Sequence, residues 1–145
     1  MADIIIVGAG PAGLTAAIYA RRAGRQALVF EAAVYGGQIV NTPEIENYPA
    51  IKKISGYEFA TALYEQATSL GAEVKMERVI KVTDNGAAKT VTTDNGDYEC
   101  KAVILATGAK NRPLGLENEK ALIGKGVSYC ATCDGMFFRK KRVAV

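Results

Sequence analysis

Residues 8–13 of the chain read Gly8-Ala9-Gly10-Pro11-Ala12-Gly13 and fit the pattern G-x-G-x-x-G. A short apolar run at residues 3–7 precedes the motif and predicts a buried strand, and the alanine-rich residues 13–23 predict a helix. A second strand is predicted at residues 26–30, and Glu31 follows it, 18 residues past the last glycine of the motif. This order of elements is typical of a dinucleotide-binding βαβ unit.

Each residue of this unit has a physical role. Gly8 permits a tight turn, Gly10 lets the backbone approach a pyrophosphate, and Gly13 allows helix and strand to pack closely. The helix N-terminus offers free N–H groups to the phosphates, and Glu31 is expected to accept hydrogen bonds from a ribose diol. The alternative is a glycine-rich turn that only packs well, and the acidic residue at the right distance argues against it. The motif alone does not distinguish FAD from NAD.

Further elements are predicted along the rest of the chain. Residues 35–54 read as a loop, residues 56–70 as an amphipathic helix, and after Gly71 the hydrophobic period changes to two. The chain is therefore predicted to be an α/β protein with a Rossmann-like parallel sheet and an inserted antiparallel β-meander. The strands predicted after Gly71 are residues 79–83, 89–93, 97–100 and 102–106, and residues 142–145 begin another.

Composition narrows the function classes. The 145 residues carry a net charge of +3, which gives little attraction for nucleic acid. The one dense basic run, residues 139–142, reads as a solvated approach to a strand. No basic residue precedes the first apolar run, and no apolar stretch is long enough to span a membrane. Three cysteines without a signal peptide favour a reducing compartment, so a cytoplasmic protein with no membrane partner is predicted.

The second chemical signal is Cys130-Ala131-Thr132-Cys133-Asp134-Gly135. Two cysteines at this spacing can form a small disulfide that carries two electrons by thiol–disulfide exchange, and Asp134 is a candidate proton donor or acceptor. A zinc knuckle is the main alternative, but zinc needs four ligands, and the chain adds only Cys100 and has no histidine. We therefore predict no metal site. An inert, buried pair of thiols is the other alternative.

These two motifs occur in order with three others: Gly36-Gly37-Gln38, Glu46-Asn47-Tyr48-Pro49 and Ala106-Thr107-Gly108. Together they resemble the bacterial low-molecular-weight thioredoxin reductases, and the resemblance spans the whole chain. It implies FAD at the glycine motif, with the last of the three motifs as a second flavoprotein signature. Besides Gly8 and Gly13 of the motif, the residues that it places along FAD are Gly10, Pro11, Ala12, Glu31, Gly37, Gln38, Asn47, Val79, Ala106, Thr107 and Gly108.

The same resemblance implies a reaction. Cys133 is expected to face the flavin, Cys130 to attack the disulfide of the partner, and Asp134 to act as the acid. Electrons would pass from NADPH to FAD, to this disulfide and then to thioredoxin, in a homodimer. Residues 1–115 are then the N-terminal part of an FAD-binding domain, and residues 116–145 begin an NADPH-binding domain that carries the disulfide.

Two departures from the family pattern are visible. Ala50 follows Tyr48-Pro49 where the family usually has glycine. The chain also ends at Val145, before a second glycine fingerprint for NADPH. We therefore expect a portion of a longer reductase, unable to turn over NADPH alone. Two alternatives are a related flavoprotein disulfide reductase with another electron donor or acceptor, and a non-catalytic FAD-binding module. The cysteine pair argues against the latter.

Overall fold

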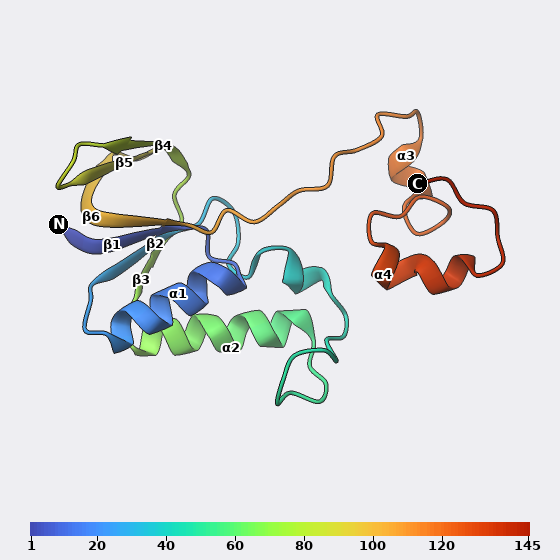
Figure 1. Cartoon of the computed structure of the whole chain (residues 1–145), viewed down its shortest axis with the longest axis horizontal. Coiled ribbons are helices and arrows are strands. Elements are labelled where there is room, and N and C mark those ends of the chain that lie inside the picture. Colours follow the sequence, from blue (N-terminus) through green and yellow to red (C-terminus); the bar gives the residue numbers. More distant parts are fainter. The chain divides into compact units, whose positions relative to one another are not determined.

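A computed structural model describes all residues, 1–145, and divides the chain into two compact units, Met1–Gly108 and Ala109–Val145 (Figure 1). The division predicted from the sequence, after residue 115, falls inside the second unit. The first unit contains the glycine motif and the whole sheet, and the second contains the cysteine pair.

The sheet of the first unit has six strands in the order β3-β2-β1-β6-β5-β4. β1 pairs in parallel with β2 and with β6, and β2 pairs in parallel with β3. β4, β5 and β6 form an antiparallel meander. The predicted fold class is therefore confirmed. The strands are β1 (Ala2–Val7), β2 (Ala27–Phe30), β3 (Glu73–Lys75), β4 (Val79–Asp84), β5 (Lys89–Thr93) and β6 (Asp97–Leu105).

Two details of the sheet differ from the prediction. The two strands predicted at residues 97–100 and 102–106 are one continuous strand, β6, whose first half pairs with β5 and whose second half pairs with β1. Cys100 lies at the changeover, opposite Lys89 on one side and Ala2 on the other. The sequence reading also missed β3, because it is three residues long and carries a single apolar side chain, Val74.

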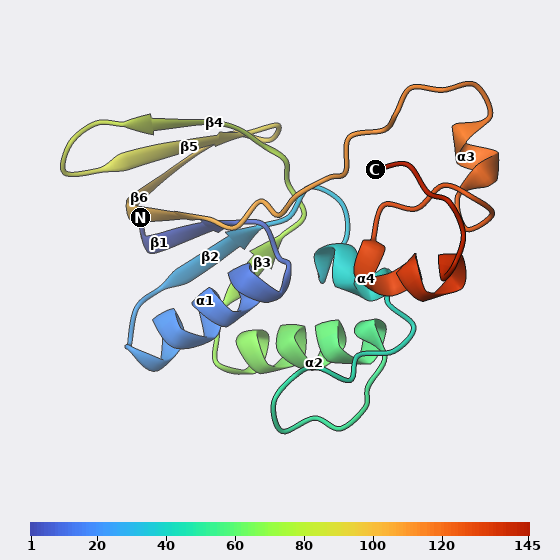
Figure 2. The same ribbon diagram turned by 45° about the vertical axis from the view of Figure 1, so that its right-hand side comes forward.

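Helices α1 (Pro11–Arg22) and α2 (Gly56–Ser69) lie side by side on one face of the sheet, and the β4–β5 hairpin lies on the other side (Figures 1 and 2). Ser55 caps α2: its hydroxyl accepts a hydrogen bond from the Glu58 amide while the Glu58 carboxylate accepts one from the Ser55 amide. Between the two helices, the predicted loop contains a short 3₁₀ helix, η1 (Gly37–Asn41).

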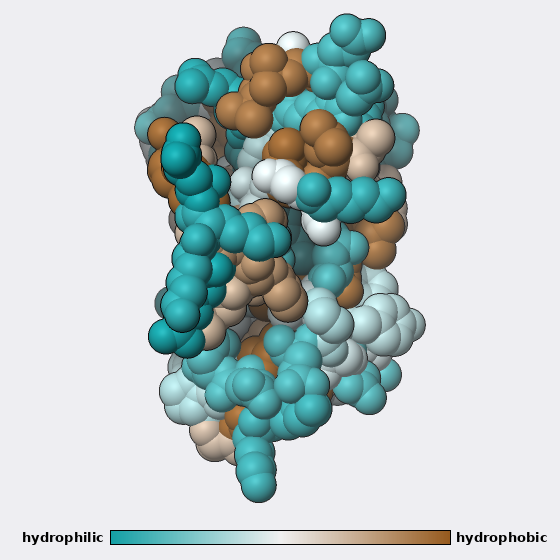
Figure 3. All heavy atoms as spheres, turned by 90° about the vertical axis from the view of Figure 1, so that its right-hand side faces the viewer, coloured by the Kyte–Doolittle hydropathy of each residue, from teal (hydrophilic) through white to brown (hydrophobic).

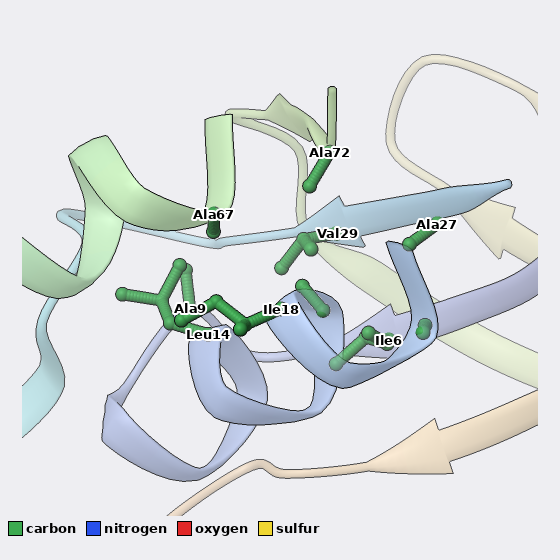
Figure 4. Packing of buried hydrophobic residues seen from close by; sticks show 10 residues of the cluster. Ile6, Ala9, Leu14, Ile18, Ala27, Val29, Ala67 and Ala72 are labelled. Carbon is green, nitrogen blue, oxygen red and sulfur yellow. The ribbon is translucent and has the colours of Figure 1, made fainter. Parts of the chain in front are cut away.

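The core of this unit forms between the sheet and the two helices. Figure 4 shows Ile6 and Val29 of the strands facing Leu14 and Ile18 of α1, with Ala67 of α2 beside them. A second cluster on the opposite face of the sheet joins Ile5, Leu28, Phe30, Val91 and Cys100. The two clusters fix both faces of β1 and β2, whose carboxyl ends carry the glycine motif and Glu31.

Residues 45–54 form a turn that contains Ala50, the first departure from the family pattern. The amides of Ile45 and Ile54 each donate to the other's carbonyl, and the Ile51 amide donates to the Tyr48 carbonyl across Pro49 and Ala50. Ala50 has φ of 69°. A positive φ after proline is typical of a type II turn, in which glycine is preferred at that position. Alanine therefore adopts a left-handed conformation that costs free energy here.

The second unit has little regular structure. It contains α3 (Glu119–Leu122), α4 (Ala131–Asp134) and the 3₁₀ helix η2 (Gly135–Phe138). The strand predicted at residues 142–145 is wrong: these residues form no strand, and no other segment of the chain pairs with them. No helix in the whole chain has the length and apolar character needed to cross a membrane.

Candidate functional site

Two glycines of the motif are required by the packing around them. Gly8 has φ of 105°, and a Cβ added there would lie 2.3 Å from the Ala106 carbonyl oxygen. A Cβ on Gly13 would lie 1.8 Å from the Gly8 carbonyl oxygen. The start of α1, the end of β1 and the end of β6 therefore approach one another as closely as backbones can, and Ala106 lies against the motif.

Gly10 differs from both. Its φ is −74°, which any residue adopts, and a Cβ added there meets nothing within 4 Å. No side chain caps α1, and the Leu14 amide is the first to bond back into the helix, to the Gly10 carbonyl. The amides of Ala12 and Gly13 thus stay free at the positive end of the helix dipole. Open space beside uncapped amides is the arrangement that a pyrophosphate needs.

Glu31 is held next to the motif. Its carboxylate accepts hydrogen bonds from the Ala9 amide at 2.9 Å and from the Ala33 amide at 3.0 Å. An ionised carboxylate has about four lone-pair sites, so two remain for other donors. The carboxylate is therefore fixed in direction and still able to accept from a diol.

The segment of Gly36 and Gly37 also lies at the motif. The Gly36 amide donates to the Ala9 carbonyl at 2.7 Å, and a Cβ on Gly37 would lie 3.4 Å from the Gly10 Cα. Gln38 continues into η1 with an exposed side chain. Asn47 is exposed in the loop before the turn of residue 50, and no hydrogen bond joins it to the motif. Roles for Gln38 and Asn47 at a ligand therefore remain predictions.

A cavity of about 230 Å³ opens beside the motif. It brings together four of the predicted residues, Gly8, Glu31, Val79 and Thr107, which come from four separate segments of the chain. Sequence reasoning missed Glu77 and Arg78, because isolated charged residues before a strand give no periodic signal. The full lining is Val7, Gly8, Phe30, Glu31, Ala32, Glu77, Arg78, Val79 and Thr107.

Glu77 anchors one wall of this cavity. Its carboxylate accepts hydrogen bonds from the Thr93 hydroxyl at 2.7 Å and from the Tyr98 hydroxyl at 2.9 Å. The Thr93 hydroxyl lowers the pKa of Glu77 most, Tyr98 adds to the effect, and the carboxylate stays ionised at neutral pH. The Asp94 amide also donates to the Arg78 carbonyl. The link from β3 to β4 is thus fixed against the meander.

In the second unit, Cys130 and Cys133 form a disulfide at the start of α4. The Cys133 amide donates to the Cys130 sulfur at 3.2 Å, and the Asp134 amide donates to the Cys130 carbonyl at 3.0 Å. A backbone N–H aimed at a sulfur stabilises negative charge on it when the disulfide opens. The geometry therefore favours Cys130 as the thiolate of the reduced pair.

Comparison with known proteins gives the family. The profile of the pyridine nucleotide-disulphide oxidoreductases matches residues 2–145. The chain belongs to this family. Thioredoxin reductase of Listeria monocytogenes is 46% identical over 143 residues, which cover 99% of this chain and 45% of that protein. This pyridine nucleotide-disulphide oxidoreductase chain thus spans a little under half the length of the curated relatives that it matches.

Solved structures agree with the fold. Thioredoxin reductase from Streptococcus pyogenes superimposes with a TM-score of 0.84 at 46% identity, covering 95% of this chain and 45% of that one. A ferredoxin-flavin thioredoxin reductase from Clostridium acetobutylicum gives a TM-score of 0.71 at 35% identity, covering 94% of this chain and 47% of that one. The predicted resemblance to thioredoxin reductases is confirmed.

Other features of this family member lie away from both motifs. A cavity of about 710 Å³ is lined by residues such as Met1, Gln26 and Glu73 at the amino ends of the strands, and by none of the predicted site residues. No group of three or more histidine, cysteine, aspartate or glutamate side chains is placed to hold a metal ion. Cys100 is buried, and burial raises the pKa of its thiol, so it stays protonated at neutral pH.

Proposed function

We propose that this chain is the FAD- and disulfide-bearing part of a thioredoxin reductase, which passes electrons from NADPH through FAD and the Cys130–Cys133 disulfide to thioredoxin. The proposal rests on one observation, the occurrence of two features together in a chain of this family. These features are a glycine motif with free amides at the start of α1 and a Cys-x-x-Cys disulfide followed by an acidic residue. The Listeria monocytogenes relative named above is called a thioredoxin reductase.

The residues of the glycine motif fit FAD. The open backbone at Gly10 and the free amides of Ala12 and Gly13 would bind the pyrophosphate, and the fixed carboxylate of Glu31 would bind the ribose diol. Val79 lines the same cavity as Glu31 and would contact the adenine end. When bound, FAD supplies a group that accepts a hydride and passes electrons to a disulfide.

The cysteine pair would carry two electrons at a time. Reduction breaks the Cys130–Cys133 bond and adds two electrons and two protons. In the next step Cys130 attacks a disulfide of thioredoxin, a mixed disulfide forms, and the leaving thiolate of thioredoxin takes a proton from Asp134. Cys133 then attacks Cys130, which restores the pair and releases reduced thioredoxin. The balance is two electrons out for two electrons in.

A second candidate keeps the chemistry and changes the electron donor. The Clostridium acetobutylicum relative is named a ferredoxin-flavin thioredoxin reductase, and this chain is 35% identical to it. NADPH remains the proposed donor because the family profile describes pyridine nucleotide enzymes.

The proposal also includes a homodimer in the cytoplasm. The 145 residues contain a single G-x-G-x-x-G fingerprint, so we expect this chain alone not to oxidise NADPH.

The first experiment is a visible absorption spectrum of the purified chain after incubation with FAD and desalting. Retained flavin absorbance supports the proposal. Gly10→Ala gives a matched variant, because the new methyl meets no atom of the chain. It should leave the urea unfolding midpoint unchanged but weaken FAD binding at least about tenfold, since one lost hydrogen bond to a charged group is worth about 1.5–3 kcal/mol. Equal FAD affinity in both proteins would argue against pyrophosphate at Gly10.

The second experiment tests the disulfide. Anaerobic titration of the FAD-loaded chain with dithionite should consume two electrons for the flavin and two more for the Cys130–Cys133 pair. Cys133→Ser should remove two of these four electrons and leave the flavin spectrum in place. Two electrons in both proteins would mean that the pair does not exchange electrons with the flavin, as in a non-catalytic FAD-binding module.

A further inference from the structure

Ser128 has a place in the cysteine segment that none of the assigned roles explains. Its hydroxyl donates a hydrogen bond of 2.6 Å to the Asp134 carboxylate and accepts one of 3.1 Å from the Cys130 amide. The Cys130 carbonyl lies farther away, at 3.3 Å. A hydroxyl has one proton, and the shorter bond to the charged acceptor takes it. Ser128 therefore joins the acid to the backbone of the first cysteine.

No other side chain or amide holds the Asp134 carboxylate. It takes part in no ion pair, and its one hydrogen bond comes from Ser128. Asp134 is half-buried. A carboxylate with no other hydrogen-bond partner can take several rotamers, so this one hydroxyl decides where the carboxylate points. Cys130 is the N-cap of α4 and Asp134 is its last residue, and the Asp134 amide donates to the Cys130 carbonyl at 3.0 Å. Ser128 contacts both residues, so the carboxylate is held close to the backbone of Cys130.

We infer that Ser128 is a positioning residue for disulfide exchange, and that it acts by holding the Asp134 carboxylate beside Cys130. This inference rests on the proposed function. The Asp134 carboxylate takes the proton of Cys130, and the Cys130 thiolate then attacks the disulfide of the acceptor. The acceptor's S–S bond breaks, a Cys130–acceptor S–S bond forms, and the leaving thiolate takes the proton from Asp134. Cys133 then closes the disulfide and releases the second acceptor thiolate.

A kinetic measurement on the reduced chain tests this. The reduced chain is mixed with oxidised glutathione, and samples are quenched with an alkylating reagent at successive times. Mass spectrometry then gives the rate at which Cys130 and Cys133 are oxidised, because oxidised cysteines are no longer alkylated. Ser128→Ala should slow the reaction about tenfold, a part of the 10²–10⁴-fold that a positioned acid–base group contributes. Ser128→Thr keeps the hydroxyl and should restore the rate to within about twofold of the original. Ser69→Ala, which removes a hydroxyl-to-carbonyl bond in α2, should change nothing.

A double-mutant cycle separates positioning from a general structural effect. If Ser128 acts through Asp134, the double variant Ser128→Ala/Asp134→Asn reacts as slowly as Asp134→Asn alone. Additive losses in the double variant would overturn the inference, as would an unchanged rate in Ser128→Ala. The proposed function is tested separately, by measuring NADPH-dependent reduction of thioredoxin by the full-length protein. The absence of this reduction together with a clear Ser128 effect would reject the reductase and leave the positioning role standing.

Discussion

In Met1–Gly108 the side chains of two helices and two strands close over a continuous apolar core, whereas in Ala109–Val145 no apolar side chain is buried. The one buried residue of the second unit is Glu119. Its carboxylate accepts hydrogen bonds from the amides of Leu114, Gly115 and Leu116. Figure 3 shows hydrophobic side chains at the molecular surface among polar ones. In the second unit, Met136 and Phe137 are both exposed.

The difference separates two ways of holding a functional group. Burial and close backbone packing fix the glycine motif, and under the proposed function they keep the pyrophosphate site rigid before the ligand binds. Single polar contacts hold the cysteine segment, through Glu119 and Ser128. Segments with few buried apolar contacts open at low free-energy cost. Under the proposed function the disulfide exchanges electrons with two partners, and a segment that opens at low free-energy cost permits this.

Gly13→Val should produce the largest effect and test how strictly burial holds the first unit. The new Cβ would lie 1.8 Å from the Gly8 carbonyl oxygen, and backbone cannot move aside cheaply. We expect a loss of more than about 5 kcal/mol, which is the whole stability of many domains. Urea unfolding followed by circular dichroism measures it. A stable, folded variant would show that the turn is far softer than its geometry indicates.

Leu14→Ala and Leu116→Ala compare the two units directly. Leu14 is fully buried, whereas Leu116 is 64% exposed. The first substitution should cost about 2–5 kcal/mol through the cavity that it leaves, and the second less than about 0.5 kcal/mol. Thermal unfolding gives both values. Similar losses at the two positions would mean that the second unit hides an apolar core under the conditions of the experiment.

Ala50→Gly should stabilise the first unit at a place where burial plays no part. Glycine removes the strain of a left-handed alanine but costs more backbone entropy on folding. The net gain should be about 0.5 kcal/mol. Ala50→Val is the matched control and should destabilise by about 1 kcal/mol, because β-branched residues avoid positive φ. The same sign for both substitutions in urea unfolding would contradict the turn geometry.

The smallest expected effect is a local pH dependence in the second unit. Backbone hydrogen bonds, that from Leu114 first, hold the pKa of Glu119 below its ordinary value of 4.5. A carboxyl whose folded-state pKa is lowered stabilises the fold above its unfolded pKa, and this is lost as the pH falls through the folded value. The amides of residues 114–116 should therefore exchange hydrogen faster below about pH 4.5, after correction for intrinsic rates. Glu119→Gln should remove this dependence.

Much of the first unit was predictable because its signals are local. The strand, motif and helix of residues 3–23 give an unbroken pattern of period and punctuation, and Glu31 follows at the expected distance. β3 escaped notice because three residues are too few to show a period. The two halves of β6 differ in polarity and read as two strands, whereas the structure continues one strand past Cys100.

The second unit was predicted less well for a related reason. A strand exists only when another strand pairs with it, and residues 142–145 have no such partner. Their apolar character alone was therefore misleading. Glu77 and Ser128 were missed because a single polar residue acquires its role from contacts that no periodic pattern encodes. The cysteine pair was found because its spacing is itself the geometry of the disulfide.

The position of β6 late in the unit also delays the pairing of one edge of β1 during synthesis. β1 finds β2 soon after synthesis, but its other edge pairs with residues near position 101, 98 positions after Asp3. At about 5–20 residues per second, that edge waits on the order of 5–20 s for its partner. During this interval one edge of the isoleucine-rich strand β1 is unpaired and prone to aggregation. The nascent chain is thus most in need of a chaperone before residue 105 has emerged.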